Sequence, residues 1–228
     1  MDPFSIISIV KIIAPLVTAI IALIAGIIEL RLNPKNWLNR WFFSFFISAT
    51  LGYLLYGIYH LVIFSPTIIS IISAITQIFF NFIAISLVMT VFVLEKFPKI
   101  AMSPKYLGTM LVIFILMSFG YFIWFPIVDP VLYPNIINTT TPLPWLVFVN
   151  ILRMLLFGYT VVKYAMITKK TEGEAKRRIR WFFIGDIIFV IGLIFNLFGG
   201  IFNIVEAEIL ALILFNLGAI ILAKGFFM

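Results

Sequence analysis

The fold is decided by residues 41–94, which read WFFSFFISATLGYLLYGIYHLVIFSPTIISIISAITQIFFNFIAISLVMTVFVL. This stretch holds no Asp, Glu, Lys or Arg, and its apolar run is divided at Ser65-Pro66-Thr67. Because about 20 apolar residues suffice for a helix to cross the roughly 30 Å hydrocarbon core of a bilayer, the stretch is long enough for two spans. Proline suits the first turn of a helix. The sequence therefore predicts two transmembrane helices, 41–64 and 67–94, joined by a tight turn.

The same pattern recurs along the chain, with hydrophobic runs at about 4–30, 106–128, 143–167, 181–203 and 205–223. Of the 228 residues, 64% are hydrophobic and 11% are charged, whereas soluble domains carry roughly 45–50% apolar and about 25% charged residues. In hydrocarbon each run must satisfy its backbone hydrogen bonds internally, as a helix does. We therefore predict an all-α polytopic membrane protein in which residues 1–228 form a single seven-helix transmembrane bundle.

Lys and Arg fall in alternate connections between the predicted spans. The first, third and fifth connections are basic, whereas the second, fourth and sixth contain no Lys or Arg. Cytoplasmic loops of membrane proteins carry an excess of these residues. The alternation predicts an N-terminus outside and a C-terminus in the cytoplasm, in a multi-pass protein of the cell membrane. The division between the sixth and seventh spans is the least distinct, so six spans with Lys224 outside is the alternative.

Two ionisable residues lie deep in the predicted spans. Arg153 is about ten residues into the fifth span from the outer side, and Asp186 about six residues into the sixth from the inner side. At 1.5 Å per residue their depths differ by about 6 Å, and intramembrane charges commonly pair inside the bundle. We therefore predict an Arg153–Asp186 ion pair, either static or broken in a conformational switch. The alternative places Asp186 at the inner interface, near Arg177 and Arg180.

Lys11 lies in the outer third of the first predicted span. Its natural partners are Glu206 and Glu208 at the outer end of the seventh span, provided that the first helix packs against the seventh. Alternatively, its ammonium group reaches the outer headgroups by snorkelling.

Polar and small residues form stripes on the second, third and sixth spans. Small residues let helices approach closely and amides bond across helices, so packing is the simplest explanation of the stripes. The alternative is a wet or ligand-holding cavity in the outer half, bounded by Tyr56, His60, Gln77, Asn81 and Asn196. Histidine titrates near neutral pH in water, which would allow a pH-sensing role for His60.

Two predicted loops carry further candidate sites. On the outer side, Asn138-Thr139-Thr140 matches an N-glycosylation acceptor at Asn138, although a chance match is the alternative. On the inner side, the fifth connection carries Lys169, Lys170, Lys176, Arg177, Arg178 and Arg180. Such a run binds acidic lipid headgroups at about 1 kcal/mol per residue, or an acidic cytoplasmic partner. Alternatively, it only enforces topology.

The composition excludes several kinds of site. The chain has no cysteine and one histidine, so disulfides, thiolate metal sites, cysteine nucleophiles and multi-histidine metal centres within one subunit are excluded. The spans also lack a nucleophile–base pair or a cluster of carboxylates. We therefore expect no enzymatic activity, no cofactor and no metal. Topology explains the net charge of +7, so nucleic acid is not expected as a partner.

A retinal protein is the first seven-helix class to test, and we reject it. A Schiff-base lysine lies mid-helix opposite a carboxylate in the third span, but Lys224 is four residues from the end and the third span has no acid before Glu95. A transporter needs a chain of ionisable groups, broken helices or an internal repeat. We find no such repeat, so a small-solute transporter is a remote alternative.

Two segments carry a resemblance to a known family. The segment 33–42, NPKNWLNRWF, followed by 51–57, LGYLLYG, resembles the first loop and second helix of the seven-helix sensor regions that precede membrane histidine kinases. The basic run 176–180 is similar too. The chain departs from that pattern because no kinase domain follows the seventh span. The resemblance implies a receptor-like module that signals through a cytoplasmic partner. The alternative function is that of a non-catalytic structural subunit in a larger membrane complex.

Overall fold

The computed structural model describes residues 6–62, 64–134, 137–202 and 204–225. The helices within them are α1 Ile6–Leu32, α2 Trp37–Leu61, α3 Pro66–Ala101, α4 Pro104–Ile123, α5 Leu143–Lys170, α6 Gly173–Phe202 and α7 Val205–Lys224. All seven contain a stretch long and apolar enough to cross a membrane. The predicted all-α, seven-helix bundle is confirmed. Residues 4, 5 and 203, which belong to the predicted first and sixth spans, lie outside the described residues.

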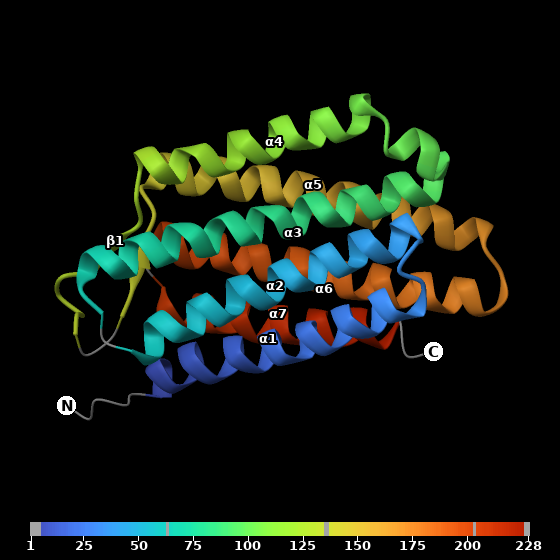
Figure 1. The fold of residues 1–228 in the computed structure, drawn as a ribbon. Coiled ribbons are helices and arrows are strands. Elements are labelled where there is room, and N and C mark those ends of the chain that lie inside the picture. The colour runs from blue at the N-terminus through green and yellow to red at the C-terminus, as the bar shows by residue number, and fades with distance from the viewer. Residues whose placement is uncertain (1–5, 63, 135–136, 203, 226–228) are drawn as a thin grey trace.

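The helices pack side by side into an elongated bundle (Figure 1). Consecutive helices pack against each other from α1 to α3 and from α5 to α7, while α3 packs on α5 and α1 on α7. The contact between α1 and α7 closes the bundle. In contrast, α4 lies at the edge, mainly against α3. It therefore presents apolar side chains outward, among them Leu111, Ile115, Phe119 and Phe122.

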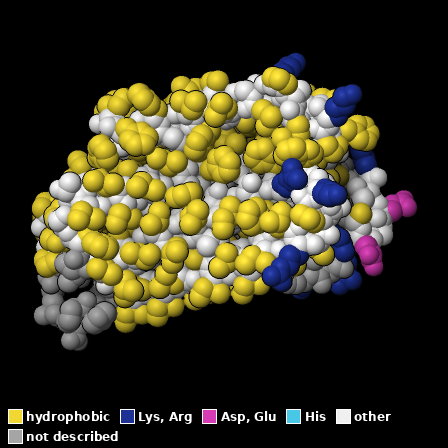
Figure 2. Space-filling view, viewed as in Figure 1, with side chains coloured by type: hydrophobic (Ala, Val, Ile, Leu, Met, Phe, Trp, Pro, Cys, Tyr) yellow, Lys and Arg dark blue, Asp and Glu magenta, His cyan; other side chains and the backbone are white. Residues whose placement is uncertain are grey.

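The two ends of the bundle differ in their connections (Figure 1). One end, which we name the basic end, holds the connections at 33–36, 102–103 and 171–172 and the C-terminal end of α7. The other, the hairpin end, holds the short strands β1 (Ile127–Val128) and β2 (Thr139–Thr140). Figure 2 shows Lys and Arg gathered toward the basic end, with apolar side chains over the rest of the visible face.

The predicted fourth span, 106–128, is wrong at its end. A proline inside a helix removes a backbone hydrogen bond and clashes with the preceding turn, and α4 ends at Ile123, before Pro126. The residues beyond it form β1 instead, which pairs antiparallel with β2 in the register Ile127↔Thr140 and Val128↔Thr139. This pair of strands lies in the connection between α4 and α5.

The sixth helix begins earlier than predicted. It starts at Gly173, eight residues before the expected start at 181. Glu174 lies in its first turn, where a negative charge is favourable beside the positive end of the helix dipole. The basic residues between 176 and 180 therefore lie on a helix and not in a loop.

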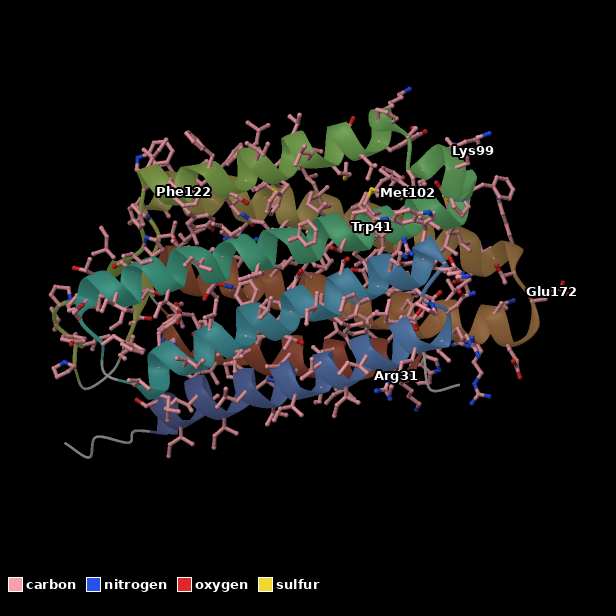
Figure 3. The ribbon with its side chains drawn as sticks, viewed as in Figure 1. Arg31, Trp41, Lys99, Met102, Phe122 and Glu172 are labelled. Carbon is pink, nitrogen blue, oxygen red and sulfur yellow. The ribbon has the colours of Figure 1, made fainter. Side chains whose placement is uncertain are left out.

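The third helix changes direction at Phe97, where φ is 62° and ψ is 150°. Pro98 follows, and a proline disfavours the helical conformation for the residue before it. The last turn of α3 therefore departs from the line of the helix. Trp41 Nε1 donates a hydrogen bond to Met102 Sδ at 3.3 Å, which ties this turn to α2 (Figure 3).

Aromatic rings fill the centre of the bundle. Phe189 of α6 stacks on Phe157 of α5, with ring centroids 5.9 Å apart, and on Phe215 of α7 at 5.8 Å. Phe45 of α2 meets the Phe189 ring edge-on at 6.2 Å. Aromatic pairs favour such offset and edge-on arrangements. These rings join four helices, and three of them also wall the cavity described next.

Candidate ligand-binding cavity

A cavity of about 130 Å³ lies inside the half of the bundle nearer the hairpin end. One water molecule needs about 10–15 Å³ of such space, so the cavity has room for several waters or one small organic molecule. Its polar lining comprises Tyr53, Tyr56, Tyr59, His60, Gln77, Asn138, Thr139, Thr140, Thr141, Arg153, Asn196 and Glu208. Its apolar lining comprises Phe80, Ile83, Leu146, Phe157, Phe189, Leu193, Gly200, Ala211, Leu212 and Phe215.

The structure brings four of the five residues predicted for an outer-half cavity into this lining. They are Tyr56, His60, Gln77 and Asn196. Asn81 is fully buried but lies outside the lining, where it binds Arg153 from behind. The polar stripes of the second, third and sixth spans therefore meet at one place, because α2, α3 and α6 all face the interior here.

Arg153 lies in the cavity wall and is held by α3. Its Nε donates to Asn81 Oδ1 at 2.9 Å. Its Nη2 donates both to the carbonyl oxygen of Gln77 at 3.0 Å and to Gln77 Oε1 at 2.9 Å. Asn81 in turn donates to the Met117 carbonyl of α4 at 2.8 Å. The guanidinium group is thus fixed in place by neutral oxygens, and the arginine is only 4% exposed.

The predicted Arg153–Asp186 ion pair is not formed. Asp186 is fully buried and accepts a hydrogen bond through Oδ2 from Thr160, while its Oδ1 has no hydrogen-bond partner among the described residues. Thr160 follows Arg153 by seven residues on α5, which is about 10 Å along the helix axis. Asp186 therefore lies level with Thr160, too far toward the basic end to meet the guanidinium group.

Lys11 has the carboxylate partner expected from the closing of the bundle. It is 1% exposed, and its Nζ lies 3.2 Å from Glu208 Oε2. The prediction is confirmed for Glu208, whereas Glu206 is exposed. The same ammonium group donates to Asn138 Oδ1 at 2.9 Å. One buried cation thereby joins α1, α7 and the segment that leads into β2.

Asn138, the predicted glycosylation acceptor, serves the interior of the bundle. Its side chain lines the cavity and accepts the hydrogen bond from Lys11. The neighbouring Thr139 Oγ1 lies 3.2 Å from Ser73 Oγ of α3. The acceptor sequence is thus engaged by the bundle, and its modification stays a prediction.

The side of the cavity nearest the hairpin end is aromatic and polar. The His60 ring lies 4.3 Å from the Tyr56 ring and 4.4 Å from the Tyr59 ring. Its Nδ1 lies 2.8 Å from the Tyr56 carbonyl oxygen, which can only accept, so Nδ1 donates. The histidine is thereby fixed by its own helix.

The charges around the cavity do not cancel. Arg153 and Lys11 contribute two positive charges and Glu208 one negative charge, which leaves one positive charge. The salt bridges among the described residues are Lys11–Glu208 and Lys163–Glu95. Arg153 therefore has no carboxylate partner in the part of the chain that the structure describes.

The six basic residues predicted as a contact surface lie together at the basic end. Lys169 and Lys170 end α5, and the other four lie on the first turns of α6. All of Lys169, Lys170, Lys176, Arg177, Arg178 and Arg180 are exposed. They are accessible to headgroups or to a partner, and which of these they contact stays a prediction.

Sequence reasoning missed much of the cavity wall. Asn138, Thr139 and Thr140 come from a segment whose pairing with β1 has no hydrophobic signal. Phe157, Phe189 and Phe215 also line the cavity, but nothing in the pattern separates them from lipid-facing rings in a chain with 26 phenylalanines. The signal that the sequence did carry is the set of polar stripes on α2, α3 and α6, which include Tyr56, His60, Gln77 and Asn196.

The cavity thus offers hydrogen-bond donors, aromatic walls and one cation without a counter-ion. No group of three His, Asp or Glu side chains suited to a metal ion is found among the described residues. No protein-family model matches the chain, and no curated protein matches it. The function is therefore argued from the cavity and its surroundings.

Proposed function

We propose that this chain is a receptor-like membrane module that binds a small molecule in the cavity and signals to a cytoplasmic partner. The cavity between the helices carries the proposal. Small-molecule sites are concave, mostly apolar and fitted with a few placed polar groups, and in helical proteins they lie between helices. A structural subunit of a larger complex, the alternative, needs no such space, so the cavity favours the receptor.

The helices that wall the cavity also reach the opposite end of the bundle. From Arg153, α5 continues to Lys170, which is about 25 Å at 1.5 Å per residue. α6 carries the basic residues at its start and lines the cavity with Phe189 and Asn196. A ligand that binds one arrangement of these helices better than another shifts the population toward it. Because α5 and α6 carry the six basic residues, a change in how these helices pack would move those residues without a loop rearrangement.

The proposal includes an orientation in the cell membrane. We place the hairpin end outside and the basic end in the cytoplasm, because Lys and Arg gather toward the basic end (Figure 2) and mark cytoplasmic loops. The chain has no cysteine, so an introduced thiol is the only one to react. In intact cells, a membrane-impermeant maleimide should label Asp129→Cys and leave Glu172→Cys unlabelled until lysis. The reverse result would overturn the orientation.

Ligand retention tests the binding function. The protein is purified in nanodiscs and its small molecules are extracted and identified by mass spectrometry, with empty nanodiscs as the blank. The wild type should retain a discrete molecule near one per chain. Ala211→Leu, which adds volume at the cavity wall, should lose it, while Ala165→Leu on α5 outside the lining should keep it. Equal retention by both variants would contradict binding in this cavity.

A further inference from the structure

The cation in the cavity wall is not neutralised by the protein. Arg153 is 4% exposed and its hydrogen bonds run to the uncharged oxygens of Asn81 and Gln77. A buried charge without a partner of opposite sign is costly, and charges inside a membrane usually pair. Something else that reaches this cavity must therefore supply the negative charge, and a bound anion does so.

The guanidinium group has donors left for such an anion. It carries five N–H groups, of which Nε uses one and Nη2 uses two toward α3. Tyr121 is a further hydrogen-bond partner of the guanidinium group and, as a phenol, brings no negative charge. Among the described residues, no hydrogen bond from Nη1 to a carbonyl or carboxylate oxygen is found. Because Asn81 and Gln77 already fix the plane of the group, little side-chain freedom is lost when it binds a ligand. A hydrogen bond from Nη1 to a carboxylate oxygen would be charge-assisted, and such bonds are shorter and roughly twice as strong as neutral ones.

The walls beside Arg153 suit an apolar body. Phe157 lies one turn further along α5, and its ring stacks on Phe189, which stacks on Phe215. Stacked and edge-on rings favour aromatic partners beyond the area that they bury. The volume of about 130 Å³ sets the size of a small organic molecule.

The side of the cavity toward the hairpin end is polar and nearly balanced in charge. Glu208 is held by Lys11 at 3.2 Å, so its carboxylate does not repel an anion on its own. His60, Asn138 and Thr139 complete this side. A water-borne ligand therefore passes polar groups before it reaches the arginine.

We infer that the cavity binds a small carboxylic acid with an apolar, preferably aromatic, body, its carboxylate on Arg153 and its body against the rings of Phe157, Phe189 and Phe215. This inference rests on the proposed function and names the class of ligand. It assigns Arg153 the role of specificity-determining residue, whereas Asn81 and Gln77 position it.

The test compares an acid with its neutral isostere. Binding of 3-phenylpropionate and of 3-phenylpropanamide to the protein in nanodiscs is measured by calorimetry in chloride-free buffer, so that chloride does not occupy the guanidinium group. Hydrogen bonds to charged groups contribute about 1.5–3 kcal/mol, so the acid should bind about 10- to 100-fold more tightly than the amide. Acetate, which lacks the apolar body, should bind more weakly than the phenyl acid.

Two variants assign the preference to the arginine. Arg153→Gln should bind the acid and the amide equally, because the variant removes the positive charge that favours the carboxylate and leaves the cavity walls unchanged for both ligands. Lys163→Gln removes a cation from the same helix outside the cavity and should keep the wild-type preference. Size-exclusion profiles and thermal unfolding check that both variants are folded.

The outcomes separate the two proposals. Equal binding of acid and amide by the wild type would overturn the inference and leave a cavity that binds uncharged molecules. A preference that persists in Arg153→Gln would overturn the assignment to Arg153. If the wild type binds none of the probes and also retains no molecule on purification, the proposed function itself fails.

Discussion

The two halves of the bundle place their charged side chains differently. In the half nearer the hairpin end, Lys11, Arg153 and Glu208 point inward and gather around a cavity. In the half nearer the basic end, the Lys and Arg side chains lie mostly outside (Figure 2), and rings and small residues fill the interior. Glu29 and Asp186 are buried there, but neither lines the cavity. We call the half that surrounds the cavity the chamber and the closely packed half nearer the basic end the stem. The same apolar helices thus build a cavity with polar groups in one half and close packing in the other.

Loss of Glu208 should give the largest effect on stability, because the chamber depends on its ion pair. Glu208→Gln leaves Lys11 buried without a carboxylate partner. Removing one member of a buried pair costs about 3 kcal/mol or more. The midpoint of thermal unfolding in detergent should fall, and adding Lys11→Met should restore it. Glu206→Gln, on an exposed residue, is the matched control, and a similar loss there would break the comparison.

Close helix packing in the stem should be the next most sensitive feature. A Cβ on Gly185 would lie 2.8 Å from Leu222 Cγ and 3.1 Å from the Gly218 carbonyl oxygen of α7. Gly185→Leu should therefore force α6 and α7 apart at about 1–3 kcal/mol, occasionally more. A Cβ on Gly158 meets nothing within 4 Å, so Gly158→Leu should be tolerated. Unfolding midpoints give the test, and equal midpoints for the two variants would show that the stem is not tightly packed.

Asp186 is a buried acid that lies outside the cavity, so its loss of a partner should affect stability and not ligand binding. Thr160→Val removes its hydrogen-bond donor and should lower the free energy of unfolding by about 1–3 kcal/mol. Thr168→Val, whose hydroxyl bonds only to the Tyr164 carbonyl of its own helix, should change it little. Neither variant should alter ligand binding. A changed acid-to-amide preference in Thr160→Val would mean that Asp186 influences ligand binding at Arg153 although it lies outside the cavity.

The exposed basic residues should give the smallest effect per residue. Lys176→Glu and Arg180→Glu reverse charges that would face anionic headgroups. Each basic residue near the surface contributes about 1 kcal/mol to such binding. Native mass spectrometry of protein released from nanodiscs with phosphatidylglycerol should show fewer retained lipids. Lys163→Gln, at a half-buried residue in a salt bridge with Glu95 outside this surface, should retain them. Unchanged lipid retention in the reversed variants would leave these residues a topological role only.

The helices could be predicted from sequence because hydrocarbon leaves the backbone few choices. α3 begins at Pro66, within the turn that divides the second and third predicted spans. The contact of Lys11 with Glu208 follows from the closing of α1 on α7. These features depend on one helix or on one pair of neighbours, so periodicity and polarity suffice to find them.

The partners of Arg153 and Asp186 could not be predicted, because depth was counted from the ends of apolar runs. α5 spans 28 residues and α6 spans 30, and both extend beyond those runs toward the basic end. The ends of the runs are therefore not level with each other. The sequence also does not rank a neutral amide, such as Gln77, above a carboxylate as the partner of an arginine.

The short strands at the hairpin end bear on how fast a bound ligand would leave the cavity. β1 and β2 pair through only two residues each, and such short pairing contributes little stability on its own. Thr139 and Thr140 of β2 also wall the cavity. For the ligand proposed above, we expect that separating the strands opens the cavity without moving a helix, so that the strands set the residence time while Arg153 sets the affinity. Dissociation rate and equilibrium constant can then be tuned by different parts of the chain.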